Sequence, residues 1–284
     1  MDLVAQGFIS DHIIRPSLEL LDTFNLYFSN LMPLGSRGIM SYPFYHMRSE
    51  PFWALIPNKG FTDQSGRTIS SMTKLNQIYS GAKIDEELFG LMADMNSRES
   101  LRHALVDTYF ASEIQSAVLQ QGVVNLAAYQ YSHELLGVAE RKNIYQSVSE
   151  ETEEKKKIRD QGFRKAIVHL YNHRCALCGI RMLTPEGHTV VEAAHIVPWR
   201  KSQDDRPTNG MSLCRLCHWS FDEGLMGVGK DYEVKISKRV RIEQNFPGHI
   251  LTLSERKIFT PEETGFWPDQ ENLDWHRNEI FKQT

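Results

Sequence analysis

Two Cys-x-x-Cys pairs constrain this chain more than any other feature. Cys175 with Cys178 and Cys214 with Cys217 account for all four cysteines among its 284 residues. Four thiolates readily bind tetrahedral zinc, and two such pairs a few tens of residues apart are the usual sequence form of a structural zinc site. Disulfides fit less well, because the first residues lack the basic leader and uninterrupted apolar core of a secretion signal. The pattern therefore predicts one structural Zn²⁺ and a reduced, cytoplasmic protein.

The segment between the two pairs predicts a ββα unit. Residues 188–197 are rich in β-branched side chains and end before Pro198, which favours a strand. Residues 200–210 are polar and contain proline and glycine, which is typical of a loop. Apolar residues recur at helical intervals from 212 to 225, and Gly224 suits the end of a helix. On such a helix His218 and Asp222, four residues apart, project from the same face.

Three short motifs in this segment resemble the HNH family of DNA endonucleases, in its modification-dependent, type IV-like restriction branch. The motifs are Glu192-Ala-Ala-His195-Ile-Val-Pro198, Asn209-Gly210 and His218-Trp-Ser-Phe-Asp222-Glu-Gly-Leu225. Residues 162–171 are similar to the helix that precedes the first cysteine pair in that branch, and residues 273–281 to its C-terminal signature. The resemblance implies a ββα-metal nuclease fold, a DNA substrate and a divalent cation.

The chemistry of these residues supports the same expectation. Phosphodiester hydrolysis needs an activated water and a cation that neutralises charge on the phosphate. His195 can accept a proton from water near neutral pH, which makes it the expected general base. His218 is the expected metal ligand on the facing helix, with the Asp222 carboxylate one turn later. Asn209 carries a donor and an acceptor and is expected to tie the loop to the His195 strand.

One position departs from the family pattern. Many HNH enzymes carry an acidic or histidine ligand directly before the general base, whereas this chain has Ala194. Side chains alternate along a strand, so Glu192 shares a face with Ala194 and could supply the missing carboxylate. Glu192 and Asp222 could equally be solvent-exposed acids without a ligand role. An oxygen-rich site with open positions favours Mg²⁺ or Mn²⁺, although histidine also tolerates Ni²⁺ or Zn²⁺.

Positive charge is concentrated around the expected site. The whole chain has 32 basic and 36 acidic side chains, net -4, which argues against a generally basic DNA-coating protein. Residues 156–230 hold 12 basic and 7 acidic side chains, net +5. Basic residues in this segment are expected to contact the phosphates of double-stranded DNA without reading its sequence. They are Arg164, Lys165, Arg174, Arg181, Arg200, Lys201, Arg206 and Arg215.

The length of the chain predicts two domains. The charged stretch 149–159 suggests a boundary near residue 150, with a DNA-recognition domain at 1–150 and the nuclease domain at 151–284. Apolar spacing predicts helices over 11–30, 84–95, 98–110 and 112–137, whereas residues 40–57 are interpreted as a surface loop plus a strand. The expected class is α+β, a mainly helical N-terminal domain beside a ββα-metal domain with a four-cysteine zinc site. No apolar run approaches the ~20 residues of a membrane span.

The aromatic segment 40–57, with an Arg-Pro pair before it, resembles the sulfur-binding domain of restriction enzymes that recognise phosphorothioate DNA. In that family a Tyr-Pro pair lines an apolar pocket for the sulfur, while His and Arg side chains hold the DNA backbone. The resemblance implies contacts to sulfur from Tyr42 and Pro43, and contacts to phosphate from Arg15, His46 and Arg48. Sulfur is larger and less strongly hydrated than oxygen, so an apolar wall favours it. The alternative is that these aromatics fill a small core.

Three functions remain open on the sequence alone. The favoured one is a metal-dependent restriction endonuclease in host defence that selects modified DNA. The second is a DNA-binding zinc module without cleavage activity, which Ala194 makes conceivable. The third is an HNH nuclease of homing or phage packaging, indifferent to DNA modification. Double-strand cleavage by an enzyme with one site per chain usually needs two copies, so a homodimer is a further expectation.

Overall fold

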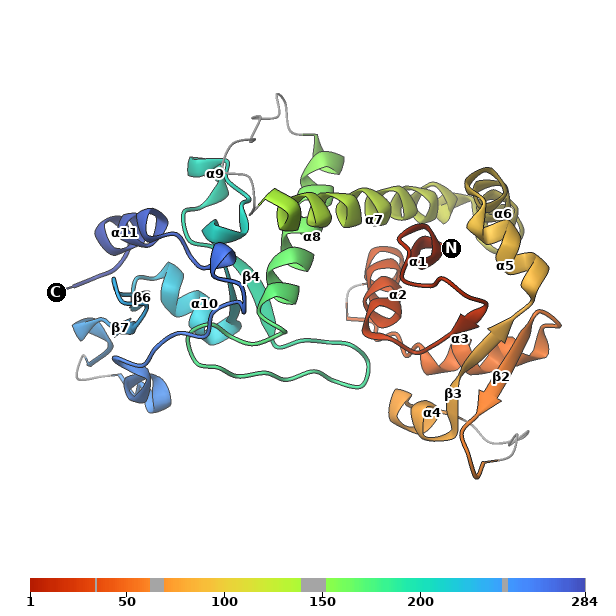
Figure 1. Cartoon of the computed structure of the whole chain (residues 1–284), viewed down its shortest axis with the longest axis horizontal. Helices are drawn as coiled ribbons and strands as arrows, with labels where there is room; N and C mark the ends of the chain where they lie inside the picture. Colours follow the sequence, from red (N-terminus) through yellow and green to blue (C-terminus); the bar gives the residue numbers. More distant parts are fainter. Residues whose placement is uncertain (34, 62–68, 139–151, 242–244, 284) are drawn as a thin grey trace. The chain divides into compact units, whose positions relative to one another are not determined.

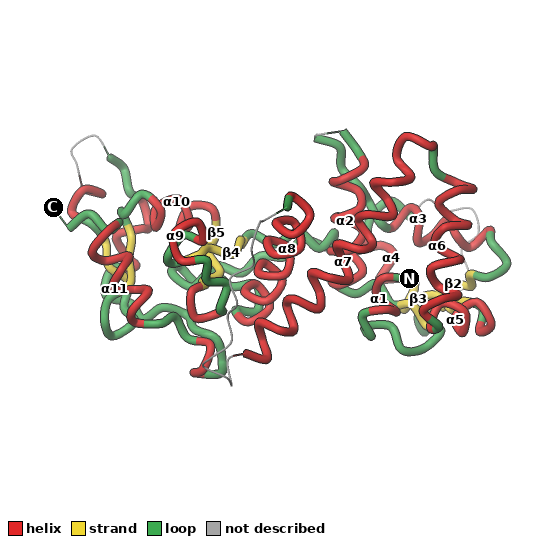
Figure 2. Tube along the Cα trace, turned by 90° about the horizontal axis from the view of Figure 1, so that it is seen from above, coloured by secondary structure: helices red, strands yellow, loops and turns green. Residues whose placement is uncertain are grey.

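The computed structural model of the chain describes residues 1–33, 35–61, 69–138, 152–241 and 245–283. The chain divides into two compact units, one of Met1–Ala127 with Thr184–His188 and one of Ala128–Leu183 with Thr189–Thr284. Helix α7, Ser112–Val138, contributes residues to both. The expected domain boundary near residue 150 lies outside the described residues. Helices predominate among short strands (Figure 2), which confirms the expected α+β class.

The first unit is mainly helical and contains one three-stranded sheet (Figure 1). The strand order is β1-β3-β2, and both pairs are antiparallel. The expected helices at 84–95, 98–110 and 112–137 are confirmed with small shifts of their ends. The elements are α1 Asp2–Ala5, β1 Ile13–Ile14, α2 Leu18–Leu31, α3 Ser41–His46, β2 Trp53–Pro57, α4 Met72–Ile78, β3 Tyr79–Ile84, α5 Glu86–Ala93 and α6 Met95–Tyr109.

Helix α2 begins later than the apolar spacing predicted. The expected helix over 11–30 is wrong at its start, because Ile13–Ile14 form strand β1 and pair with β3. Pro16 explains the difference, since the residue before a proline is disfavoured in the helical conformation. Ser17 then caps the helix by accepting a hydrogen bond from the backbone N–H of Leu20 at 3.2 Å.

The aromatic segment contains a helix that the sequence did not predict. The interpretation of residues 40–57 as too irregular for a helix is wrong, because Ser41–His46 form α3, while the expected strand is confirmed as β2. Pro43 is tolerated because it lies in the first turn, where a backbone N–H has no partner within the helix. Phe44 and Tyr45 are buried in the core of this unit, which leaves Tyr42, Pro43 and His46 exposed.

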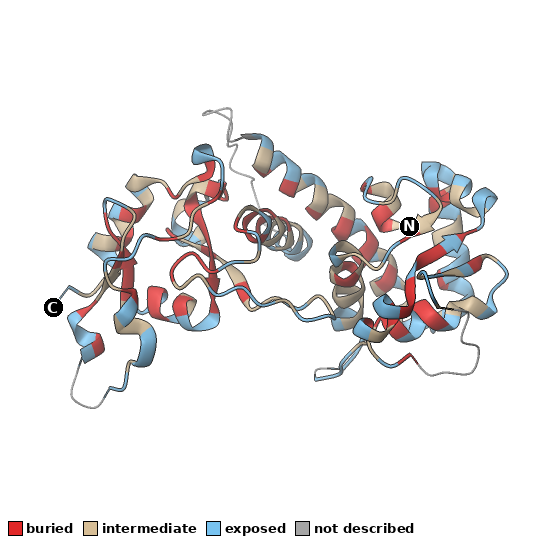
Figure 3. Cartoon of the chain, turned by 60° about the horizontal axis from the view of Figure 1, so that its bottom comes forward, coloured by how far each residue is buried: buried red, intermediate tan, exposed pale blue. Residues whose placement is uncertain are grey.

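The second unit is built around the hairpin of β4 and β5 and covered by helix α8. Its core includes Phe163 and Ile167 of α8 and Met211 of β5, and Figure 3 shows buried residues inside each unit. None of the helices in the described ranges is long and apolar enough to cross a membrane. The elements are α8 Glu153–Leu170, β4 Val191–His195, α9 Trp199–Ser202, β5 Gly210–Cys214, α10 Arg215–Asp222, β6 Met226–Val228, β7 Val234–Ile236 and α11 Gln270–Glu279.

The β4–β5 hairpin fixes where the candidate site residues lie. The strands are antiparallel, with His195 opposite Gly210 at one end and Val191 opposite Cys214 at the other. Residues 212–214, expected to begin the helix, extend β5 instead because their pairing with β4 continues to Cys214. A side chain at position 210 would collide with Ile167, so glycine lets α8 pack closely on the hairpin.

Candidate active site and metal centre

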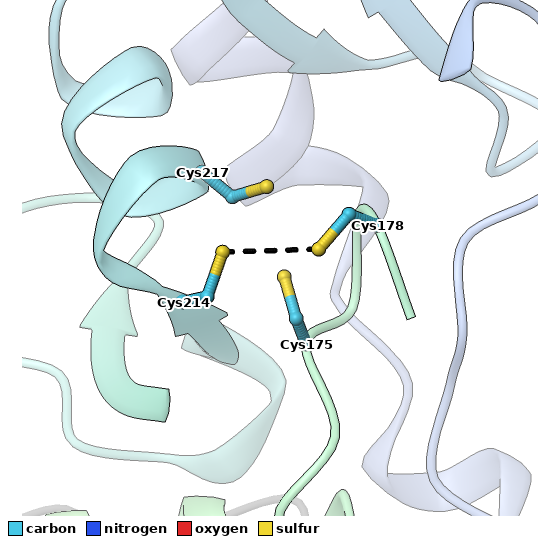
Figure 4. Close-up of side chains that lie close together, drawn as sticks. All are labelled: Cys175, Cys178, Cys214 and Cys217. Carbon is cyan, nitrogen blue, oxygen red and sulfur yellow. Dashed lines mark hydrogen bonds between the residues drawn. The ribbon is translucent and has the colours of Figure 1, made fainter. Parts of the chain in front are cut away.

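The four cysteines lie together where β5 leads into α10. Cys175 and Cys178 come from the loop after α8, Cys214 ends β5, and Cys217 lies in the first turn of α10 (Figure 4). Their sulfurs all lie within 4.8 Å of one another, and the Sγ atoms of Cys178 and Cys214 are 3.7 Å apart. A tetrahedron with ~2.3 Å Zn–S bonds has S···S edges of about 3.8 Å. The two pairs therefore form one candidate metal site, as predicted.

Contacts among the four sulfurs shift their acidities in opposite directions. Hydrogen bonding with Cys178 lowers the pKa of Cys175 to about 7. Hydrogen bonding with Cys175 lowers the pKa of Cys214 far below the ordinary thiol range, and raises the pKa values of Cys178 and Cys217 above it. Four thiolates cannot share this space without a compensating positive charge, so the donor set fits a bound cation.

A cavity of about 650 Å³ in the second unit brings together the two histidines that the sequence singled out. His195 reaches it from the end of β4, and His218 reaches it from α10 together with Asp222. The side chains of His195 and His218 are 19% and 25% exposed. Both imidazoles are thus accessible to a ligand and still held by their surroundings.

His195 is held by a residue that the sequence did not identify. Its Nε2 lies 2.7 Å from Oδ1 of Asp205, whose side chain is 1% exposed. The hydroxyl of Tyr131 on α7 donates to the other carboxylate oxygen at 2.8 Å, and the guanidinium of Arg159 lies 3.6 Å from the first. The imidazole also lies flat against the ring of Phe163, with centroids 3.9 Å apart and planes at 6°.

Asn209 joins the two sides of the loop that connects β4 to β5. It is fully buried, and its amide oxygen accepts a hydrogen bond from the backbone N–H of Val197 at 2.9 Å. Its amide nitrogen donates to the carbonyls of Val197 at 3.0 Å and Asp204 at 2.9 Å. These bonds fix the chain just after His195 and just before Asp205, so Asn209 sets the separation between those two residues.

His218 lies between two carboxylates that approach different ring nitrogens. Oδ2 of Asp222 is 3.5 Å from Nε2, and Oε2 of Glu192 is 3.4 Å from Nδ1. Glu192 also pairs with Arg215 at 3.2 Å, and only Asp222 of the two acids lines the cavity. Partial desolvation raises the pKa of the Asp222 carboxyl, against the opposing influence of His218. In the described ranges, the cysteines are the only group of three or more Cys, His, Asp or Glu side chains whose ligand atoms all lie within 4.8 Å of one another.

Basic and aromatic side chains lie around the same cavity. Lys156, Arg159 and Arg200 line it, and the guanidinium of Arg159 stacks 3.8 Å from the ring of Trp199. The ammonium of Lys201 lies 4.6 Å from the ring of Trp275, and neither residue is among those that line the cavity. Of the cations predicted to contact DNA, Arg200 is brought to the cavity, whereas Arg164 and Lys165 are half-buried on α8 and are not among its lining residues.

His276 supports the helix that carries His218. Its ring stacks on Phe221 with centroids 3.6 Å apart, and its Nε2 donates to the Phe221 carbonyl at 2.9 Å. Burial lowers the pKa of His276 to about 4, so the ring is neutral near pH 7. In the sequence, His276 was noted only as part of residues 273–281, which are similar to a C-terminal signature of the family. That similarity did not predict a role for the residue.

The residues expected to recognise modified DNA lie in the first unit. Tyr42 and His46 stack on the exposed side of α3, with ring centroids 6.3 Å apart, and Pro43 is exposed beside them. Arg48 follows the helix and lies 4.0 Å from the ring of Tyr45. Arg15 pairs with Asp11 at 3.9 Å. The structure thus gathers Tyr42, Pro43 and His46 on one surface of α3, while Arg15 follows strand β1.

Part of the second unit matches a known protein family. Residues 175–229, which include the cysteines and both cavity histidines, match the family model of the HNH endonucleases. This segment is therefore similar to an HNH endonuclease domain.

Comparison of the whole chain with curated proteins and solved structures gives only a weak similarity. No curated protein matches the chain significantly. Among solved structures, the modification-dependent restriction endonuclease TagI is similar at 21% identity and a TM-score of 0.31, over 42% of this chain and 37% of that one. The matched region thus spans well under half the length of that enzyme.

Proposed function

We propose that this protein is a metal-dependent DNA endonuclease that hydrolyses phosphodiester bonds in the cavity lined by His195 and His218. One observation carries the proposal: these two imidazoles, both from the segment that matches the HNH endonucleases, line a single cavity. In this proposal His195 takes the proton from the attacking water. Asn209 holds the backbone just after His195 and just before Asp205, so it keeps the base in place.

His218 and Asp222 would hold the catalytic ion, which we propose to be Mg²⁺ or Mn²⁺. The two donors are 3.5 Å apart and both face the cavity, and two protein ligands leave most of a coordination shell to water and substrate. When bound, such an ion neutralises charge on the phosphate and on the leaving oxygen. Glu192 was predicted as a third ligand, but its contact with Nδ1 and with Arg215 suits it better to orient His218.

Asp222→Asn is expected to raise the metal concentration needed for half-maximal cleavage by at least about tenfold. Even an indirect partner of a metal ligand changes metal affinity by roughly 10- to 100-fold when it is lost, and an amide is a weaker ligand for Mg²⁺ than a carboxylate. Titrating Mn²⁺ and Mg²⁺ against cleavage rate measures the effect. Glu223→Gln is the matched control, because Glu223 is the next residue and pairs with Lys282 at 3.8 Å. Equal metal requirements in both variants would remove Asp222 from the ion site.

The four cysteines would hold a structural Zn²⁺, since their sulfur spacing matches a tetrahedral thiolate site. Such a site needs reduced thiols, consistent with the cytoplasmic location that we propose. Lys156, Arg159 and Arg200 at the cavity would contact phosphates of double-stranded DNA. Two copies of the chain, each cutting one strand, would account for double-strand cleavage, so we also propose a homodimer.

The first unit would select modified DNA, and phosphorothioate is the modification that we propose. The exposed Tyr42, Pro43 and His46 on α3 support this, because they place two apolar rings and an imidazole on one accessible surface. A protein of this kind serves in restriction of foreign DNA. A nuclease indifferent to modification is the second candidate function, and the departure at Ala194 keeps a DNA-binding module without cleavage as the third.

Tyr42→Ala is expected to lower the affinity for phosphorothioated DNA by about tenfold, which corresponds to ~1.4 kcal/mol. It should leave binding to unmodified DNA unchanged, because the ring would contact the sulfur only. Binding of matched phosphorothioated, cytosine-methylated and unmodified duplexes measures the difference. Tyr109→Ala on α6 removes a tyrosine that is 79% exposed and serves as the control. Equal affinity of the wild type for the three duplexes would contradict the modification proposal and leave the cleavage proposal standing.

The cleavage proposal itself is tested by supercoiled plasmid incubated with the full chain and Mg²⁺ or Mn²⁺. Conversion to nicked or linear DNA is expected with either ion and not in the presence of a chelator. Retention of the plasmid in supercoiled form under all conditions, with binding preserved, would favour the module without cleavage.

A further inference from the structure

We propose that Asp205 is a positioning residue for His195, and that it makes Nδ1 of that imidazole the nitrogen that accepts the proton from water. The inference rests on the proposed role of His195 as general base. It adds a residue outside the motifs that suggested that role, and it assigns the two ring nitrogens of His195 to different tasks.

The contact between the two residues has the geometry of a strong hydrogen bond. Nε2 of His195 and Oδ1 of Asp205 are 2.7 Å apart, and the Asp205 side chain is 1% exposed. Hydrogen bonds that involve an ionised partner are short, about 2.7–2.9 Å between nitrogen and oxygen. With the Asp205 side chain this buried, little solvent competes for the contact.

The surroundings of Asp205 make it an acceptor. The Tyr131 hydroxyl donates to Oδ2 at 2.8 Å, and the Arg159 guanidinium lies 3.6 Å from Oδ1. Arg159 is itself fixed by Asp160 at 2.8 Å and by the ring of Trp199. With a hydroxyl donating to one oxygen and a guanidinium facing the other, this carboxylate serves as a hydrogen-bond acceptor. The proton between Asp205 Oδ1 and His195 Nε2 is therefore assigned to Nε2.

This assignment of the proton decides which nitrogen can act as a base. In a neutral imidazole, one ring nitrogen carries the proton and the other carries a free lone pair. The nitrogen that donates a hydrogen bond must be the protonated one, so the other nitrogen is the one that can accept a proton. With Nε2–H donating to Asp205, the lone pair is on Nδ1. Within the described ranges Asp205 is the one hydrogen-bond partner of this ring, and His195 lines the cavity.

Phe163 and Asn209 restrict the movement of His195 and Asp205 relative to each other. The imidazole lies flat on the Phe163 ring at a centroid distance of 3.9 Å, which prevents it from tilting. Asn209 binds the backbone at Val197 and Asp204, the residues that lead from His195 and into Asp205. The acid that many HNH enzymes place directly before the base is absent at Ala194. Here the loop supplies a carboxylate to the base itself.

The ring nitrogens of His195 can be observed directly by ¹⁵N NMR of the full chain labelled at histidine, with His195→Gln to assign the signals. Above the titration range of the ring, we expect His195 to show a protonated Nε2 and an unprotonated Nδ1. Asp205→Asn should abolish this preference, because an amide can donate or accept. Asp204→Asn is the matched control in the same loop and should leave the signals unchanged, since the Asp204 carboxylate pairs with Arg206.

Two NMR results would overturn the proposal. One is a wild-type His195 protonated at Nδ1. The other is an Asp205→Asn spectrum with the wild-type tautomer. The wild-type measurement needs no variant of Asp205, so it decides the question even where Asp205→Asn does not fold.

Cleavage kinetics separate positioning from metal binding. Loss of the aspartate that fixes the histidine tautomer in a Ser-His-Asp triad lowers kcat by about 10⁴-fold, so we expect Asp205→Asn to lower kcat by about 10²- to 10⁴-fold. The KM for DNA and the half-saturating Mn²⁺ concentration should stay within about twofold, and Asp205→Glu should recover part of kcat. A raised metal requirement would instead make Asp205 a ligand and overturn the proposal. Wild-type cleavage by His195→Ala would refute the base assignment while leaving the NMR result valid.

Discussion

Replacing Cys214 with serine is expected to unfold the second unit of the protein. A structural Zn²⁺ contributes an apparent ~10–16 kcal/mol to small zinc-dependent folds, which is comparable to the whole stability of a domain, about 5–15 kcal/mol. Cys214 is the last residue of β5 and directly precedes α10. Without the metal, the strand opposite β4 and the helix that carries His218 lose their shared anchor, so the candidate site should be lost with the fold.

Thermal unfolding by circular dichroism and the zinc content per chain measure this effect. Wild type treated with a strong chelator should behave like Cys214→Ser. Ser212→Ala is the matched control, because Ser212 is a buried polar residue of the same strand and its hydroxyl has no hydrogen-bond partner within the described residues. Removing such a group is close to neutral or stabilising. A Cys214→Ser chain with the wild-type melting temperature and one bound zinc would contradict a structural role for the cysteines.

His195→Ala is expected to reduce cleavage by at least about 10³-fold while the fold is retained. Positioned general bases contribute roughly 10²- to 10⁴-fold to a rate, and alanine offers no group that could replace the imidazole. The side chain is 19% exposed, and its main apolar contact is one face of Phe163. The loss in stability should therefore be modest compared with the loss in rate.

Plasmid nicking with enzyme in excess over DNA measures this loss, with the melting temperature as the check on folding. His188→Ala is the control, because His188 is an exposed histidine of the segment that matches the HNH endonucleases. It should cleave at the wild-type rate. A folded His195→Ala chain that cleaves within about tenfold of the wild type would show that another group activates the water.

The metal cluster and the cavity histidines can be predicted well, because the spacing of these residues along the chain allows few arrangements of their side chains in space. Four cysteines in two close pairs can meet only if the hairpin and helix bring the pairs together, and they do. His218 and Asp222 lie on one face of α10 because four residues make about one helical turn. The strand with His195 was also expected, although it is shorter than predicted and β5 takes the first residues of the expected helix.

The partner of His195 could not be predicted in the same way. Asp205 is ten residues from His195 in a loop, and its position depends on the turn of α9 and on the three backbone bonds of Asn209. Tyr131 and Arg159 come from two helices before the first cysteine, so no local pattern relates them to this loop. The adjacent acids at 204 and 205 were the only signal, and in a sequence they are indistinguishable from solvated charges.

Helix α3 was missed for a different physical reason. Pro43 among several aromatics suggested irregular structure, but proline in the first turn removes no helical hydrogen bond. Burial of Phe44 and Tyr45 against the sheet of the first unit then determines the helix. Tertiary packing, which single-residue propensities do not include, decides the conformation of this segment.

The position of Mn²⁺ in crystals of His195→Ala bound to DNA tests the central claim most directly, because anomalous scattering locates the ion without any assumption about the reaction. We expect an ion in the cavity, coordinated by His218 and Asp222 and adjacent to a DNA phosphate. DNA bound with its phosphates away from this cavity, or manganese absent from His218 while the DNA is in place, would contradict the assignment of this cavity as the cleavage site.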